Sequence, residues 1–147
     1  MKDKIIIGSD HAGFLLKEQL RERLSHEGYS VTDAGTHTTQ SVDYPVYAKK
    51  VARAVQQGEF NRGILVCGTG LGMCYTANRF KGVRAALCTG VEMARLAASH
   101  NNANVLCMGG RIISENLAFD IALAWLSTPF EGGRHQKRID LIDDSTT

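Results

Sequence analysis

The stretch GILVCGTGLG, residues 63–72, decides which fold we expect for this chain. Its first half is a short, continuous apolar run, as in a strand that is buried on both faces of a parallel sheet. Its second half is a glycine-rich loop, in which backbone N–H groups can converge on an anion at the start of a helix. The stretch therefore predicts a strand, a loop and a helix that belong to an α/β fold.

Cys67 lies between the strand and the loop. A thiol at this position would place a base beside N–H groups that stabilise negative charge, which suits removal of a proton while charge develops on oxygen. The alternative is that Cys67 is a small buried hydrophobic residue, as most free cysteines are. This segment alone does not decide between the two interpretations.

Short apolar runs alternate with helical stretches along the rest of the chain. The alternation predicts one parallel sheet covered by helices on both faces, in a single domain that spans residues 1–147. We expect strands near residues 4–7, 31–33, 63–67, 83–87 and 104–108, and helices near 14–24, 47–57, 71–80, 91–99 and 114–126.

Polar and glycine residues follow three of the expected strands, at the edge where open parallel sheets bind ligands. Asp10 and His11 follow the first strand, residues 67–72 the third and residues 108–111 the fifth. Asp10 could accept hydrogen bonds from ligand hydroxyls, and His11 could bind a phosphate or transfer a proton. The alternative for Asp10 or for Ser9 is a helix N-cap.

Three arginines are candidates for binding an anion. Arg111 follows two glycines at the end of the fifth strand, where it is suited to bidentate phosphate binding. Arg134 and Arg138 are four residues apart and would share one face of a helix, where they repel each other unless an anion is bound. A solvated basic turn is the alternative for this charge run.

His100 lies at the end of a predicted helix, before the fifth strand. A histidine at such a position is commonly a favourable partner of the helix dipole, and proton transfer is the alternative.

Composition argues against several classes of function. A net charge of +2 is too small to indicate a nucleic-acid partner. No apolar run is long enough to cross a bilayer and the amino terminus does not resemble a signal peptide, so we expect a cytoplasmic protein without a membrane partner. The four cysteines include no C-x-x-C pair, so we expect reduced thiols and no metal. The G-x-G-x-G spacing argues against a dinucleotide cofactor.

Short blocks along nearly the whole chain resemble the ribose-5-phosphate isomerase B family, which also includes galactose-6-phosphate and allose-6-phosphate isomerases. The blocks are SDHAG at 9–13, DYP at 43–45, CGTGLG at 67–72, ANR at 77–79, VRA at 83–85, HN at 100–101, GGR at 109–111 and GGRH at 132–135. The resemblance implies a Rossmann-like three-layer α/β/α sandwich with a five-stranded parallel sheet. It also implies aldose–ketose isomerisation through an enediolate, without metal or cofactor.

The resemblance assigns a role to each candidate residue. Cys67 would be the base that moves a proton between C2 and C1, and Thr69 with the loop amides would hold the enediolate oxygen. His100 would open the sugar ring, and Asp10 would aid at the hydroxyls. The residues that would bind the substrate are Gly68, Gly70, Leu71 and Gly72 in the loop, Asp43, Tyr44 and Asn101 around the sugar, and His11, Arg111, Arg134 and Arg138 at the phosphate.

Two further expectations follow from the resemblance. Some family members use a glutamate base just after the glycine loop; Met73 occupies that position here, so the thiol would be the base. The family also implies a homodimer, or a dimer of dimers, with active sites shared between subunits. Ribose 5-phosphate is the expected substrate; a six-carbon sugar phosphate, or a non-catalytic role as a sugar-phosphate sensor, is the alternative.

Overall fold

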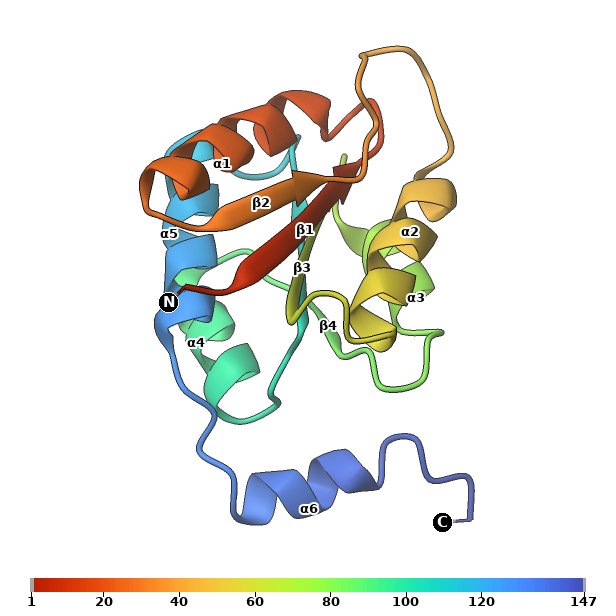
Figure 1. Cartoon of the computed structure of the whole chain (residues 1–147), viewed down its shortest axis with the longest axis vertical. Helices are drawn as coiled ribbons and strands as arrows, with labels where there is room; N and C mark the ends of the chain where they lie inside the picture. Colours follow the sequence, from red (N-terminus) through yellow and green to blue (C-terminus); the bar gives the residue numbers. More distant parts are fainter. Residues whose placement is uncertain (1, 147) are drawn as a thin grey trace.

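The computed structural model describes residues 2–146 and contains a five-stranded, wholly parallel sheet with helices on both faces (Figure 1). The α/β/α class expected from the sequence is confirmed. The strands are β1 (Lys4–Ser9), β2 (Ser30–Asp33), β3 (Arg62–Cys67), β4 (Ala85–Leu87) and β5 (Val105–Gly109). The helices are α1 (Phe14–His26), α2 (Tyr44–Gln56), α3 (Leu71–Ala77), α4 (Val91–Ser99), α5 (Glu115–Ser127) and α6 (Arg134–Asp140).

Two side chains shorten elements that the sequence predicts to be longer. The Arg84 N–H donates to Asn104 Oδ1 at 2.7 Å instead of to a neighbouring strand, so β4 begins only at Ala85. Asn78 is the C-cap of α3, and its Oδ1 accepts from the Ala85 N–H at 2.8 Å, so the helix ends at Ala77. Polar side chains that bind backbone groups compete with regular structure in this way.

Helix α2 begins at Tyr44, three residues before its predicted start. Pro45 lies in its first turn, where the fixed backbone of proline fits the helix and its missing N–H costs nothing.

The strand order is β2-β1-β3-β5-β4, so the direction of the order reverses between β1 and β3. Ser9 at the end of β1 pairs with Val66, and Cys67 at the end of β3 pairs with Gly109 of β5. The loops after β1, β3 and β5 therefore start side by side at one edge of the sheet. Ligands of doubly wound folds bind in the crevice outside such a reversal.

The core has two parts because the sheet is covered on both faces. Along β3, Ile64 and Val66 belong to the cluster that α1, α4 and α5 cover, whereas Leu65 and Cys67 belong to the cluster under α2 and α3. This alternation follows from the two-residue period of a strand. It places the Cys67 side chain on the α2–α3 face of the sheet.

None of the helices within residues 2–146 combines the length and the hydropathy that crossing a membrane requires.

Candidate active site

Cys67, the last residue of β3, is 4% exposed and forms a hydrogen bond with the loop that follows it. The backbone N–H of Gly70 donates to Cys67 Sγ at 3.1 Å. Gly70 has a φ of +84°, a left-handed conformation that glycine adopts without strain. This turn directs the Gly70 N–H toward the sulfur, so the thiol lies beside the glycine loop, as the sequence predicts.

Three loops meet around Cys67, and they can approach closely because glycines, which have no side chain, lie where the loops touch. A Cβ atom on Gly13 would lie 2.2 Å from the carbonyl oxygen of Val66, and one on Gly109 would lie 2.7 Å from the carbonyl carbon of Thr69. The Gly110 N–H also donates to the Cys67 carbonyl at 2.8 Å. Glycine at these positions thus allows the three loops to lie in direct backbone contact.

Asp10 and His11 lie in the first of these loops. Asp10 is 6% exposed, and its Oδ1 accepts from the Gly13 N–H at 3.0 Å. The N-cap of α1 is Gly13, so the interpretation of Asp10 or Ser9 as the N-cap is wrong. Asp10 nevertheless stabilises the turn before the helix through its bond with Gly13. His11 Nδ1 accepts from the Val42 N–H at 3.2 Å, which leaves the proton of a neutral imidazole on Nε2.

Tyr44 and Arg111 flank the glycine loop. A Cβ on Gly72 would lie 2.3 Å from the Tyr44 ring, and one on Gly68 would lie 3.5 Å from Arg111 Nη1. Both side chains therefore lie directly over loop positions that carry no side chain.

The exposed Asp43 precedes Tyr44 as the N-cap of α2 and makes no side-chain capping bond. Of the remaining loop residues, Thr69 and Leu71 are exposed, and Thr69 Oγ1 accepts from the Leu71 N–H at 3.2 Å.

The other predicted site residues lie at the opposite end of the molecule. His100 is the C-cap of α4, with Asn101 next to it, and both precede β5, whereas Cys67 is level with the last residue of β5. Five residues of β5 span roughly 13 Å at about 3.3 Å per residue. That separation exceeds the reach of a proton-transfer group. Within one chain, His100 and Cys67 therefore cannot act on the same carbon or oxygen.

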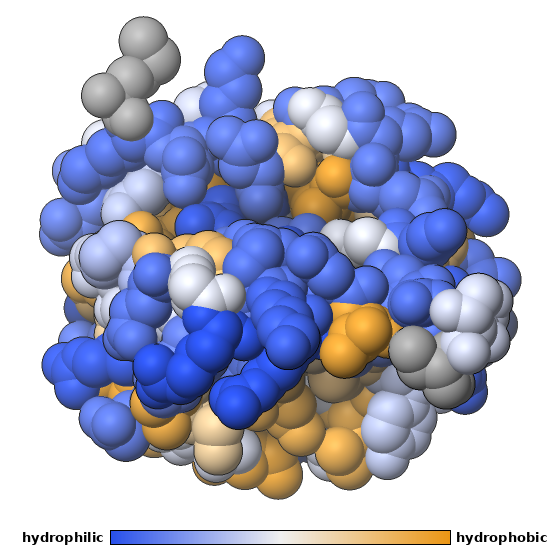
Figure 2. Space-filling view, turned by 90° about the horizontal axis from the view of Figure 1, so that it is seen from below, coloured by the Kyte–Doolittle hydropathy of each residue, from blue (hydrophilic) through white to orange (hydrophobic). Residues whose placement is uncertain are grey.

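Helix α6 carries Arg134 and Arg138 at this second end, away from the tip of the β1 arrow (Figure 1). The view from below, toward α6, shows a largely hydrophilic face that is interrupted by apolar patches (Figure 2). Leu141 and Ile142, just after α6, are 46% and 61% exposed. The basic run is thus helical, and its two arginines are exposed as a pair four residues apart.

Two residues of this second cluster were not among the candidates from sequence. The His135 ring stacks on the His100 ring with 4.2 Å between centroids and 14° between planes, and Glu131 lies beside both. Burial, together with the neighbouring His100, lowers the pKa of His135. The block GGRH contains His135, but in the sequence the neighbouring arginines indicate only a basic charge run and no signal predicts the ring stack.

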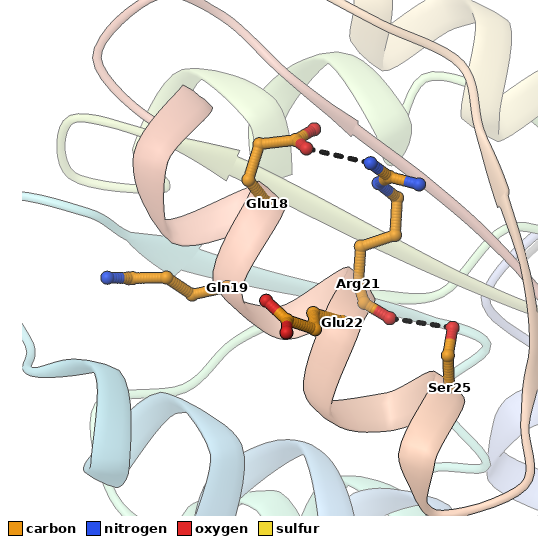
Figure 3. A pocket seen from close by; sticks show the side chains of 5 residues that line it. All are labelled: Glu18, Gln19, Arg21, Glu22 and Ser25. Atoms are coloured by element: carbon orange, nitrogen blue, oxygen red, sulfur yellow. Dashed lines mark hydrogen bonds and ion pairs between the residues drawn. The ribbon is translucent and has the colours of Figure 1, made fainter.

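Another hollow lies on the outer side of α1 and is lined by Glu18, Gln19, Arg21, Glu22 and Ser25 (Figure 3). Its polar groups bind one another: Arg21 donates to Glu18 at 2.8 Å, and the Ser25 hydroxyl donates to the Arg21 carbonyl at 2.8 Å. It contains none of the candidate residues, so it is a solvated helix surface and not a second site.

The reversal in strand order, the glycine nest and the convergent polar side chains define an α/β protein built to hold a small anionic ligand at the carboxyl edge of its sheet. Residues 5–142 match a model of the Ribose/Galactose Isomerase family, and the chain belongs to that family. The ribose-5-phosphate isomerase B of Escherichia coli K12 is 46% identical over 139 residues, which are 95% of this chain and 93% of that protein.

Solved structures agree with this assignment. A ribose 5-phosphate isomerase from Thermotoga maritima superimposes with a TM-score of 0.95 at 55% identity, over 97% of this chain and 99% of that one. The ribose-5-phosphate isomerase B of Mycoplasma genitalium, solved with bound ribulose-5-phosphate, gives a TM-score of 0.92 at 43% identity, over 95% of this chain and 93% of that one.

Proposed function

We propose that this protein is an aldose–ketose isomerase that interconverts D-ribose 5-phosphate and D-ribulose 5-phosphate. Relatives at 46% and 43% identity carry the name ribose-5-phosphate isomerase B, and one of them was solved with ribulose-5-phosphate bound. The observation that carries the proposal is the Cys67 sulfur, which accepts a hydrogen bond from the Gly70 amide of the glycine loop. A base and an anion-stabilising nest are the two groups that enediolate chemistry requires.

The reaction begins with the open-chain sugar at the loop. The Cys67 thiolate takes the proton from C2, the electrons of that C–H bond form the C1–C2 double bond, and the carbonyl electrons move to O1. Amides of residues 68–72 and the Thr69 hydroxyl stabilise the charged oxygen, and one well-placed donor contributes about 3–4 kcal/mol in related sites. Return of the proton to C1, protonation of O1 and loss of the O2 proton give the ketose.

Ring opening and phosphate binding require the second cluster. His100 acts as the acid and base that opens the ring, aided by Asp10 at the hydroxyls, while Asn101, Asp43 and Tyr44 line the sugar. His11 and Arg111 from one end, with Arg134 and Arg138 from the other, bind the phosphate and hold the reacting carbons in place.

Because the two clusters lie at opposite ends of a chain, the complete site takes one cluster from each of two subunits. The protein therefore works as a homodimer, or as a dimer of dimers, in which each pair of chains forms two equivalent sites. The reaction uses no metal or cofactor, and the free thiol of Cys67 suits the reducing cytoplasm.

Deuterium incorporation from heavy water tests the function. Wild-type protein is expected to exchange the C2 proton of ribose 5-phosphate and to form ribulose 5-phosphate, and Cys67→Ala is expected to lower the turnover number by about 10²- to 10⁴-fold. Cys88→Ala, which removes another buried thiol, is the control and should keep exchange. Wild-type exchange by Cys67→Ala would refute the base, and a strong preference for allose 6-phosphate would change the substrate but not the chemistry.

A further inference from the structure

His100, Glu131 and His135 bring three potential metal ligands together between α4 and α6. His100 Nε2 lies 3.8 Å from Glu131 Oε2, and His135 Nε2 lies 3.6 Å from Glu131 Oε1. The three ligand atoms all lie within 4.8 Å of one another. The backbone fixes this grouping, because the Glu131 N–H donates to the Ser99 carbonyl at the end of α4 at 3.0 Å.

The Nε2 atom of His135 is the unusual member of this group. The side chain is 8% exposed, yet its Nε2 has no hydrogen-bond partner. Buried polar atoms are nearly always paired, since an unpaired one costs about 1–3 kcal/mol. A buried nitrogen without a partner, next to a carboxylate and a second imidazole, indicates a ligand that these groups share.

We propose that His100, Glu131 and His135 form a binding site for Zn²⁺, completed by water, and that the bound ion inhibits the isomerase. Two imidazole nitrogens, one carboxylate oxygen and a water are a donor set that zinc takes in proteins. Zinc–donor bonds of about 2.0–2.1 Å in a tetrahedron keep donor atoms roughly 3.4 Å apart. The two distances to Glu131, 3.6 and 3.8 Å, need to shorten by only a few tenths of an ångström, whereas the two imidazole nitrogens, which lie within 4.8 Å of each other, must also approach.

One ring must turn for the ion to bind. The two imidazoles are stacked, so their Nε2 lone pairs do not yet point at a common centre. The His100 side chain is 39% exposed and borders a cavity of about 380 Å³, which gives it room to rotate and gives the ion a path inward. The guanidinium groups of Arg134 and Arg138 act on His135 and oppose a dication, so the site binds zinc more weakly than a structural zinc site does.

The inhibition rests on the proposed function, because it works through His100. Zinc on Nε2 removes the nitrogen that would exchange protons with the ring oxygen of the sugar, and the turned ring no longer faces the substrate. The ion is thus an inhibitor that competes with ring opening, and not a cofactor of the reaction.

Titration of metal-free protein with zinc chloride tests the site, with heat of binding and isomerase rate measured side by side. Wild type is expected to bind one zinc per chain. Glu131→Gln should weaken zinc binding by about 10- to 100-fold or more, because mutating even a residue that only supports a metal ligand lowers metal affinity by that factor. The zinc concentration that halves the isomerase rate should rise in parallel. Glu92→Gln is the matched control, because Glu92 is 77% exposed and pairs only at 3.7 Å with Arg95.

Cobalt(II) separates this site from binding at cysteines. Cobalt on two histidines and a carboxylate gives ligand-field absorption without the thiolate-to-metal band that a cysteine ligand would add. A thiolate band, or equal zinc affinity of wild type and Glu131→Gln, would overturn the proposal. Absence of isomerase activity in zinc-free wild type would instead count against the proposed function, because the binding measurements do not depend on turnover.

Discussion

Around Cys67, the residues without side chains set the geometry as firmly as the thiol itself. Gly13 and Gly109 let the loops after β1 and β5 approach the loop after β3 to distances that a methyl group would forbid. Contacts of this kind involve backbone atoms, which cannot move aside as the end of a flexible side chain can. The position of the proposed base is therefore sensitive to single methyl groups several residues away.

Gly13→Ala is expected to lower both stability and activity. Its new Cβ would lie 2.2 Å from the Val66 carbonyl oxygen, so the free energy of unfolding should fall by about 3 kcal/mol as the loops separate. Urea denaturation measures the loss. Gly90→Ala is the control: a Cβ there meets nothing within 4 Å, and the loss of an N-cap glycine costs about 1 kcal/mol or less. Equal losses in the two variants would contradict this packing argument.

Cys74 is expected to react with alkylating reagents near neutral pH. A hydrogen bond from the Cys107 side chain lowers the pKa of the Cys74 thiol to about 7, and the pKa of Cys107 is raised in turn. Because the thiolate is the reactive form, iodoacetamide labelling of Cys74 should rise with pH and reach half its maximum near pH 7. Peptide mass spectrometry follows the labelling residue by residue.

The Cys107→Ala variant provides the check on this prediction. Without the Cys107 donor, the pKa of Cys74 should move up toward its ordinary value, and the labelling curve should shift to higher pH. An unchanged curve would show that the hydrogen bond does not set the reactivity of Cys74.

At the scale of elements, a buried ion pair connects α1 to the end of β2. Lys17 is fully buried, and its Nζ donates to both oxygens of Asp33 at 2.7 and 2.8 Å. Asp33 Oδ1 also accepts from the Gly35 N–H at 2.9 Å, where the chain enters the loop that contacts His11. Burial of the carboxyl would raise the pKa of Asp33, but the hydrogen bonds from Lys17 and Gly35 outweigh it and lower that pKa.

Lys17→Met is expected to lower the free energy of unfolding by up to about 3 kcal/mol at neutral pH. It removes the closest partner of the Asp33 carboxylate and leaves it the weaker contacts with Arg21 Nε at 3.7 Å and His37 Nδ1 at 3.5 Å. In wild type, the folded pKa of Asp33 lies below the usual 3.8, so its contribution is present above pH 3.8 and is lost as pH falls through the folded pKa. In the variant, the hydrogen bond and charge of Lys17 are gone, so the folded pKa of Asp33 should move up and stability should depend less on pH in this range.

Urea unfolding of wild type and Lys17→Met between pH 3 and 7 measures both the loss of stability and the weaker pH dependence of the variant. Lys49→Met, at an exposed lysine of α2, is the matched control and should change the free energy of unfolding by less than about 0.5 kcal/mol. Parallel pH profiles for wild type and Lys17→Met would show that the ion pair does not stabilise this junction.

The sequence predicts the elements well, because their signals are local. Apolar runs, glycines and helical spacing locate each strand and helices α1 to α5 to within a few residues, and the polar residues after β1, β3 and β5 converge as expected. For α6 the sequence leaves a helix and a solvated basic turn both open. The misplaced ends, such as the start of β4, depend on side chains of distant segments such as Asn104. The Lys17–Asp33 pair and the His100–His135 stack join residues 16 and 35 positions apart, and no periodic pattern reveals such contacts.

At the scale of the whole molecule, the two ends of the sheet hold different halves of the proposed chemistry. The base and the anion nest lie at the carboxyl edge, and the ring-opening histidine with the paired arginines lies at the other. Under the proposed function, a chain of this kind completes its site only with a second chain, and a two-fold arrangement would complete two sites at once.

Mixing two inactive variants tests this arrangement. Cys67→Ala and His100→Ala chains, unfolded together and refolded, should recover about one quarter of wild-type activity, because half of the dimers are hybrids and each hybrid has one intact site. Steady-state assays of the mixture measure the recovery. A mixture of Cys67→Ala with Thr69→Ala is the control and should recover none, since both changes damage the same end. Equal behaviour of the two mixtures would mean that each site comes from a single chain.

The placement of the two clusters at opposite ends also bears on inheritance. If a cell carries two defective copies of the gene, one without Cys67 and the other without His100, the two products together should restore isomerase activity although neither does so alone. Two copies that both fail at the Cys67 end cannot. Testing defective alleles in pairs would therefore divide the site residues into two groups. Residues of one group would lie at the carboxyl end of the sheet and residues of the other group at the opposite end.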